Sequence, residues 1–381
     1  MRITKLLGAA SVAGALALSA CDSVAPEAGV TADARATESY IVVFKDDVAN
    51  ARGLAQRLAN GNAAHVYENT IKGFAANFSP QAAAALARNP NVAYVEKDQV
   101  AVLAPPCGTP NGGPCDPGDP GDGGGGSEST PYGIARVNGG VSGAGLVACV
   151  LDSGVDLDHP DLNVDVARSR TFITSGRDSK SADDGNGHGT HVAGTIGAIG
   201  GNGQGVVGVA EGAEIIAIKV LSSSGSGSYS GVIAGVEYAA SAGCSVANMS
   251  LGGPVSQALD DAVIAASRNV IFALAAGNES DDALNHSPAR AGRFSGDNVY
   301  AISAVDSRDR FASFSNYGTA VAYAAPGVAV ESTWKNGGYN TISGTSMASP
   351  HAAGVFLLGT ARTSGSAQGD PDGNPDPIIV H

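Results

Sequence analysis

The chain has 381 residues, long enough for one large domain and a smaller one, and its 43% hydrophobic content excludes a disordered protein. The 36 acidic residues outnumber the 22 basic ones and give a net charge of −14. Such a charge argues against nucleic acid or an anionic membrane surface as a partner.

The N-terminal segment, residues 1–21, has the pattern of an export sequence. Arg2 and Lys5 precede an apolar stretch of signal-peptide length, and small residues follow it. The last four residues, "LSAC", are similar to a bacterial lipobox, which predicts a lipid on Cys21 of an exported or cell-envelope precursor; an ordinary signal peptide is the alternative. No later segment approaches the roughly 18 unbroken apolar residues of a spanning helix, so we expect membrane contact only through that lipid.

A small α+β domain is predicted at residues 38–103, after a polar tether at 22–37. Apolar periodicity and turn residues predict its elements. The strands are expected at 40–45, 71–78 and 92–99, and the helices at 49–60 and 79–90. The Pro-, Gly- and Asp-rich segment 104–129 cannot bury a core and is predicted to be a linker. Within it, Cys107 and Cys115 would close a short disulfide loop or remain unpaired.

The large domain, residues 130–381, alternates apolar strands with helical segments. This alternation predicts an α/β fold, with a mainly parallel sheet covered by helices on both faces. Strands are expected at 146–152, 214–221, 245–251, 270–276 and 299–305, and helices at 189–199, 229–243, 256–269 and 346–361. Functional residues in such folds gather at the carboxyl ends of the strands.

Four polar residues stand at these positions, one in each of four motifs: Asp152 in "VLDSGV", His188 in "GNGHGTHVAG", Asn278 in "ALAAGNES" and Ser346 in "SGTSMASP". A serine nucleophile needs a base, the base needs an orienting carboxylate, and the developing oxyanion needs a donor. The four residues offer one of each. Taken singly, each has an alternative as a helix cap, a turn residue or a strand exit.

Three further residues are of types that bind metals or react, but we assign them structural roles. His191 is three residues from His188, a spacing that would suit a metal, yet no acidic third ligand stands at a fitting distance, so we assign it to packing. Cys149 and Cys244 lie in apolar surroundings and are expected to be buried thiols.

The motifs together resemble those of the subtilisin-like serine proteases. "VLDSGV", "GHGTHVAGTI", "NMSLGG", "AAGN", "FASFSNYG" and "GTSMASPH" follow in the family's order between about Thr130 and Gly359. "DGNGHGTHVAGTI" and "KVLSSSGSGSYSGVIAG" are most similar to the proteinase K branch. The resemblance implies Asp152, His188 and Ser346 as the catalytic triad, with the Asn278 side chain and the Ser346 backbone N–H as oxyanion donors.

The resemblance also implies where a substrate binds. Subtilisin-like proteases hold the substrate as an extra β-strand between two segments, which correspond here to Gly225, Ser226 and Gly227 on one side and to Ser250, Leu251 and Gly252 on the other. The wall of the P1 pocket would comprise Leu251, Gly252, Gly253, Ala275, Ala276 and Gly277. None of these is acidic, so we expect an apolar or aromatic P1 residue. Tyr229 would cover the P4 pocket, or would be a surface tyrosine packed on its own loop.

Residues 38–103 resemble the inhibitory propeptide of the same family, which assists folding and fills the cleft until it is cut away. An unrelated ferredoxin-like module is the alternative. Cleavage within 104–129 would release the protease from a tethered precursor.

The chain departs from the family pattern in three places. Ala322 stands where an aspartate commonly binds structural calcium, so calcium remains possible only at an unknown site, and no cofactor is expected for catalysis. Cys149 and Cys244 lie at other distances from their motifs than the paired cysteines of proteinase K, so that disulfide is not transferred. After Ser346 the chain is short, although residues 368–381 would still add an edge strand.

The sequence therefore predicts a secreted, self-processing and monomeric serine endopeptidase of broad specificity, with protein or peptide substrates. Two alternatives belong to other classes. One is a surface binding protein that has lost turnover, and the other is an acyl-transferring ligase or peptide cyclase.

Overall fold

The computed structural model describes residues 36–103, 127–295, 297–359 and 361–381. The predictions for the export sequence, Cys21, most of the tether, the Cys107–Cys115 pair and most of the linker lie outside these residues. Residues Thr37–His381 form one compact unit. In the described part of the chain, no helix combines the length and apolar character needed to cross a membrane.

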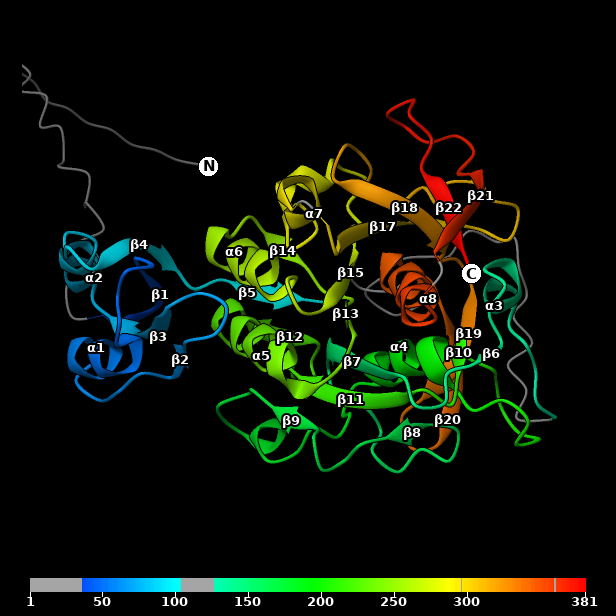
Figure 1. The fold of residues 1–381 in the computed structure, drawn as a ribbon, viewed down its shortest axis with the longest axis horizontal. Coiled ribbons are helices and arrows are strands. Elements are labelled where there is room, and N and C mark those ends of the chain that lie inside the picture. Colours follow the sequence, from blue (N-terminus) through cyan, green and yellow to red (C-terminus); the bar gives the residue numbers. More distant parts are fainter. Residues whose placement is uncertain (1–35, 104–126, 296, 360) are drawn as a thin grey trace, which may run out of the picture. The chain divides into compact units, whose positions relative to one another are not determined.

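The small domain is a four-stranded antiparallel sheet with two helices on one face (Figure 1). Its strand order is β2-β3-β1-β4. The strands are β1 (Glu38–Phe44), β2 (His65–Tyr67), β3 (Gly73–Phe78) and β4 (Val92–Lys97), and the helices are α1 (Ala51–Leu58) and α2 (Pro80–Leu86). Strand alternation divides the apolar residues of β1 between two cores. Val42 and Phe44 pack with the small domain's helices, whereas Ile41 and Val43 join the core of the large domain.

The predicted strand at 92–99 is wrong at its end. Strand β4 stops at Lys97, and a separate strand, β5 (Val100–Val102), leaves the small sheet to pair with the large domain. Strand β2 was not predicted, since three residues carry too little periodicity to identify a strand.

The large domain is built on a ten-stranded sheet, which confirms the predicted α/β fold. The strand order is β21-β22-β18-β17-β15-β13-β7-β11-β8, with β9 also on β11, and only the β21–β22 pair is antiparallel. The strands are β7 (Val147–Asp152), β8 (Asn163–Val164), β9 (Arg170–Thr171), β11 (Glu214–Lys219), β13 (Val246–Met249), β15 (Ile271–Ala275), β17 (Val299–Val305), β18 (Val321–Pro326), β21 (Arg362–Ser366) and β22 (Pro377–Val380).

Helices cover both faces of this sheet (Figure 1). Helices α4 (His188–Gly197) and α8 (Thr345–Leu357) pack on one face, and α5 (Tyr229–Ala242) and α6 (Gln257–Ala266) on the other. In β7, Ala148 and Val150 contact the first pair, while Cys149 and Leu151 contact the second. Burial on both faces explains why these strands are continuous apolar runs in the sequence.

Short elements complete the domain and shape its cleft. They are α3 (Tyr132–Arg136), α7 (Ala291–Phe294), β6 (Val141–Ser142), β10 (Ala210–Glu211), β12 (Ser226–Ser228), β14 (Gly253–Pro254), β16 (His286–Ser287), β19 (Val330–Trp334) and β20 (Gly338–Ile342). The β19–β20 hairpin, which the sequence did not predict, leads directly into the turn before α8. The C-terminal residues do add a strand, β22, but it is not the edge, because β21 pairs along its outer side.

Cys149 and Cys244 form a disulfide, so the expectation of two buried thiols is wrong. Cys149 lies in β7, and Cys244 lies in the turn before the neighbouring strand β13. Their Cα atoms are 5.7 Å apart, which is within the usual range for a disulfide. Motif spacing could not reveal this proximity, because it depends on the sheet register.

Candidate active site

Asp152 and His188 meet at the carboxyl end of β7. The imidazole Nδ1 is 2.9 and 3.0 Å from the two carboxylate oxygens of Asp152, and both side chains are buried. A carboxylate only accepts hydrogen bonds, so Nδ1 carries the proton and Nε2 has the lone pair. Nε2 is buried and has no hydrogen-bond partner among the described residues. The histidine therefore presents a basic nitrogen on the side away from Asp152.

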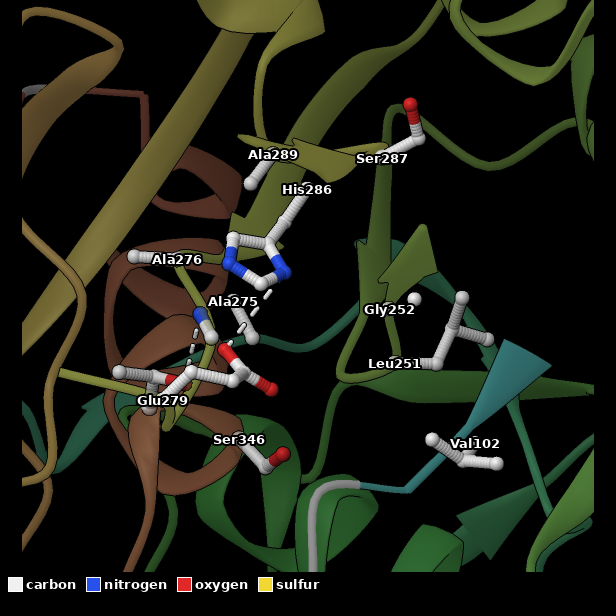
Figure 2. A pocket seen from close by; sticks show the side chains of 13 residues that line it. Val102, Leu251, Gly252, Ala275, Ala276, Glu279, His286, Ser287, Ala289 and Ser346 are labelled. Atoms are coloured by element: carbon white, nitrogen blue, oxygen red, sulfur yellow. Dashed lines mark hydrogen bonds and ion pairs between the residues drawn. The ribbon is translucent and has the colours of Figure 1, made fainter. Parts of the chain in front are cut away.

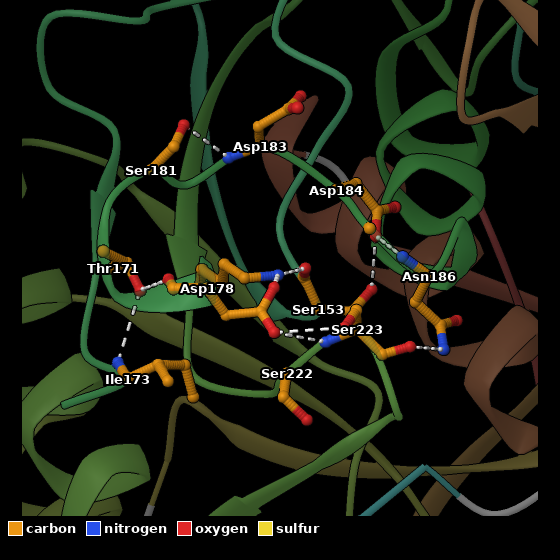
Figure 3. A network of polar contacts seen from close by, with 12 residues as sticks. Ser153, Thr171, Ile173, Asp178, Ser181, Asp183, Asp184, Asn186, Ser222 and Ser223 are labelled. Carbon is orange, nitrogen blue, oxygen red and sulfur yellow. Dashed lines mark hydrogen bonds and ion pairs between the residues drawn. The ribbon is translucent and has the colours of Figure 1, made fainter. Parts of the chain in front are cut away.

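A buried carboxylate, Asp184, fixes the start of the helix that carries His188 (Figure 3). Its Oδ1 accepts hydrogen bonds from the backbone N–H groups of Asn186 and Gly187, each at 2.9 Å, and from the Ser153 hydroxyl. Its Oδ2 accepts from the N–H and hydroxyl of Thr190. One side chain thus ties the first turn of α4 to the loop after Asp152. Sequence reasoning missed Asp184, although its place just before "GNGHGT" is that of a helix-capping residue.

Two glycines shape the start of α4. Gly187, just before the helix, has φ +114°, a conformation that favours glycine. At Gly189 a Cβ atom would collide with the backbone oxygen of Gly154. These glycines let the helix start lie directly over the loop after Asp152.

A buried lysine also holds the loop after Asp152 in place. Lys219 pairs in register with Asp152 across β7 and β11, and its side chain is fully buried. Its ammonium group donates to the backbone oxygen of Ser153 and is 3.3 Å from an oxygen of Asp178. Asp178 also accepts from the N–H and hydroxyl of Ser223 (Figure 3). The buried charge is therefore paired, as burial requires.

Ser346 lies in the first turn of α8, beneath the segment that contains Ser250. Its hydroxyl is 3.3 Å from the Ser250 backbone oxygen. Pro350 lies inside the helix and has no N–H to donate to the carbonyl of Ser346, four residues earlier. That carbonyl accepts the Ser250 hydroxyl instead, at 2.8 Å. Because Pro350 cannot donate, the Ser346 carbonyl is available for the hydrogen bond that joins α8 to the cleft segment containing Ser250.

The Asn278 side chain is held by its oxygen. Its Oδ1 accepts hydrogen bonds from the Thr345 N–H at 2.9 Å and the Thr345 hydroxyl at 2.8 Å. The Thr345 hydroxyl in turn accepts from the Gly277 N–H. A Cβ atom at Gly344 would lie 3.2 Å from Nδ2 of Asn278, which shows how closely the amide group lies to the turn before Ser346. The amide is therefore oriented beside the start of α8, where helix N–H groups lack acceptors within the helix.

The strand β5 of the small domain lies between the two segments predicted to bind substrate. It pairs antiparallel with β12, and Val102 exchanges hydrogen bonds with Gly252 at 3.0 and 3.2 Å. The Leu103 N–H donates to the Gly225 oxygen at 2.9 Å. All of these are backbone bonds, so an extended segment of another sequence has the same means of binding here.

Comparison with known proteins now identifies the family. Residues 143–365 match the Subtilase family, and residues 39–104 match Peptidase inhibitor I9. The chain belongs to the subtilase family. It is a subtilisin-like serine endopeptidase preceded by an inhibitor-type propeptide, and the small domain is that propeptide.

Several subtilases are similar over most of the chain. Subtilisin-like serine protease AsES of Sarocladium strictum is 36% identical over 92% of this chain and 90% of its own. M-protease of Shouchella clausii is 38% identical over 85% of this chain and 81% of its own. Alkaline serine exoprotease A of Vibrio alginolyticus is 41% identical, but the match spans only 52% of that protein. A solved cold adapted subtilisin-like serine proteinase, 44% identical, covers 60% of this chain and 83% of its own with a TM-score of 0.52.

A pocket opens beside Ser346 in this subtilase (Figure 2). All six residues predicted for the P1 wall line it: Leu251, Gly252, Gly253, Ala275, Ala276 and Gly277. Glu279 and His286 line it as well, so the pocket has titratable side chains in addition to the six predicted wall residues. Glu279 follows Asn278 in the motif "ALAAGNES", whereas His286 lies in β16, whose place beside the pocket could not be deduced from the motifs.

Tyr229 does not lie on the surface. Its side chain is fully buried at the start of α5, and its hydroxyl donates to the Pro254 oxygen at 2.7 Å. Ala101 of the propeptide belongs to the same buried cluster. Tyr229 therefore lies under the bound β5 strand, and the alternative of a surface tyrosine is wrong.

Two other buried histidines, His191 and His351, have structural surroundings. His191 donates from Nε2 to the Val330 oxygen and packs edge to face on Trp334, as expected for a packing residue. His351 donates from Nδ1 to the Met347 oxygen. Burial lowers the pKa of His191 to about 3 and that of His351 to about 4, so both are neutral in the folded subtilase.

Proposed function

We propose that Asp152, His188 and Ser346 form the catalytic triad of this protease. The observation that carries the proposal is the pairing of His188 Nδ1 with Asp152, which leaves Nε2 as the base. Nε2 takes the hydroxyl proton of Ser346 while Oγ attacks the scissile carbonyl. It then returns the proton to the leaving amine as the C–N bond breaks, and water hydrolyses the acyl-enzyme by the same route.

The oxyanion is held by Asn278 Nδ2 and the Ser346 N–H. Thr345 fixes the amide through its oxygen, so the nitrogen needs no reorganisation when charge develops on the substrate.

Substrates bind as an extra strand along Gly225, Ser226 and Gly227 on one side and Ser250, Leu251 and Gly252 on the other. The backbone pairing of β5 in the same groove supports this binding mode. It also supports inhibition by the propeptide, because β5 excludes any other strand while it stays bound. The mainly apolar pocket wall favours apolar or aromatic P1 residues, and backbone recognition makes specificity broad.

The protease is an exported member of the proteinase K-like branch, made as a precursor with a lipid on Cys21. The export pattern of residues 1–21 and the two branch motifs quoted above support these assignments. Self-cleavage within residues 104–129 releases a monomeric enzyme that needs no cofactor.

The test is the intact mass of the chain expressed from Asp22 onward, with Ser346→Ala beside the wild type. We expect the wild type to lose about its first hundred residues and Ser346→Ala to stay whole. Ser313→Ala, which changes an exposed serine, should process like the wild type. Equal trimming of all three variants, or an uncut folded wild type, would overturn self-processing and favour the binding-protein alternative.

A further inference from the structure

Asp98 of the propeptide binds the start of helix α5. Its Oδ1 accepts the Ser230 N–H at 3.0 Å, and its Oδ2 accepts the Ser230 hydroxyl at 2.6 Å. The N-cap residue of the helix, Ser228, accepts the Gly231 N–H instead. The first N–H groups of a helix lack acceptors within it, and the positive end of the helix dipole favours a carboxylate there. The Ser230 N–H therefore takes its acceptor from the propeptide.

This helix start directly continues the substrate groove. Strand β12 pairs with β5 as far as Ser228, which lies opposite Val100. The next residue, Tyr229, donates its N–H to the backbone oxygen of Gln99 at 2.8 Å. Asp98 precedes Gln99 in the chain, so its side chain binds at the end of an unbroken series of backbone bonds. A linear substrate can use the same backbone groups and thereby bring a side chain of its own to this place.

The register of β5 identifies the substrate residue that reaches the site. Val102 pairs antiparallel with Gly252, so a substrate residue two positions further along lies opposite Ser250. The backbone oxygen of Ser250 is 3.3 Å from the Ser346 hydroxyl, so that substrate residue is P1, whose carbonyl is attacked. Val102 then corresponds to P3 and Asp98 to P7.

We propose that the start of α5 is a binding site for a carboxylate at P7, so that the protease favours substrates with an aspartate there. The inference rests on the endopeptidase function proposed above and adds a remote acidic residue to its substrate class. When the propeptide leaves, the N–H and hydroxyl of Ser230 lose Asp98 and can bind a substrate carboxylate. Hydrogen bonds to an ionised acceptor are stronger than those to a neutral one. Because P7 is remote from the reacting bond, this contact lowers KM and leaves kcat unchanged.

A second propeptide carboxylate does not give a comparable site. Glu96 accepts the Ala258 N–H at the start of α6, at 3.1 Å. Glu96 belongs to β4, however, and pairing with β1 holds that strand in position. A linear substrate brings no such sheet with it, so the proposal is limited to P7.

The test compares peptide anilides with phenylalanine at P1 and either aspartate or asparagine at P7. These two side chains have similar shape and differ in charge. The measured quantity is the ratio of kcat/KM for the aspartate peptide to that for the asparagine peptide, with the processed enzyme at low salt. A third donor to Asp98, the Ser39 hydroxyl, belongs to the propeptide and is not offered to a substrate. We therefore expect a ratio of about three to five, expressed in KM and falling towards one at high salt.

The position of the acid is an internal control. Aspartate at P6 or P8 in place of P7 takes the carboxylate away from Ser230. The chain's net charge of −14 gives acidic peptides no general advantage, so these peptides should have ratios near one. Equal gains at P6, P7 and P8 would overturn the site, since they would show attraction without a fixed position.

Two serine variants on α5 test the protein side of the contact. Ser230→Ala removes the hydroxyl donor and keeps the N–H, so the P7 ratio should fall about two-fold. Ser241→Ala, which changes an exposed serine near the other end of the helix, should keep the wild-type ratio. An unchanged ratio in Ser230→Ala would overturn the proposal. If this variant is not obtained as processed enzyme, the comparison of P6, P7 and P8 in the wild type decides the matter.

The failures of the two proposals are distinguishable. An enzyme that cleaves none of the peptides contradicts the endopeptidase function and this inference together. An enzyme that cleaves the aspartate and asparagine peptides equally well keeps the function and overturns the inference.

Discussion

Asn278 offers its amide to the cleft only because Thr345 binds its oxygen. Removing one oxyanion donor costs subtilisin about 10² to 10³ in kcat, and we expect Asn278→Ala to lose a similar factor with little change in KM. Steady-state kinetics on a peptide substrate measures this. Asn163→Ala, on the exposed strand β8, is the matched control and should keep wild-type rates. An equal loss in both variants would mean that the effect is not on the oxyanion.

Sequence reasoning identified four site residues that end a strand or begin a helix, but it missed Glu279, which follows Asn278 in the same motif and lines the pocket. Asp152, His188, Asn278 and Ser346 each follow a strand or begin a helix, so strand order predicts that they gather at one edge. His286 lies in the two-residue strand β16, and its neighbours in sequence carry no periodicity. Its position depends on tertiary packing that a single sequence does not show.

Helix α4 depends on Asp184 for the orientation of its first turn. Asp184→Ala removes acceptors for the N–H groups of Asn186, Gly187 and Thr190, so we expect kcat/KM to fall about ten- to a hundred-fold as His188 loses its position. The exposed neighbour variant Asp183→Ala should have little effect. Thermal unfolding of both variants separates lost positioning from lost folding. Wild-type kinetics in a stable Asp184→Ala would contradict this role.

Strands stabilised by their own buried apolar side chains could be predicted from the sequence, whereas strands stabilised mainly by pairing with a distant segment could not. Strands such as β7 and β11 are buried on both faces, so their apolar runs are evident in the sequence. Strand β5 has only three residues and β12 has no apolar residue, so both exist through pairing with each other. Their partner is distant in the chain, so the sequence placed the substrate groove only by resemblance to a family.

Several side-chain contacts hold the propeptide to the protease in addition to β5, and one of them is made by a carboxylate on α5. Glu237 accepts the backbone N–H groups of Glu68, Asn69 and Thr70, at 2.6 to 2.9 Å. In Glu237→Gln an uncharged amide replaces the carboxylate that accepts these N–H groups. We therefore expect the rate of propeptide dissociation to rise about ten-fold. The measurement is the lag before activity appears after self-cleavage of the full chain. Asp183→Asn, remote from these contacts, should keep the wild-type lag; an unchanged lag in Glu237→Gln would contradict the expectation.

The disulfide between Cys149 and Cys244 closes a loop of 95 residues that includes both Asp152 and His188. A protease at high concentration cuts exposed loops of its own copies, and several such loops lie within this span. A cut there divides the chain without separating the pieces, because each remains attached to the other through sulfur. Nicked molecules would therefore keep an assembled triad and appear as fragments only after reduction. The crosslink makes the enzyme tolerant of the damage that its own activity causes.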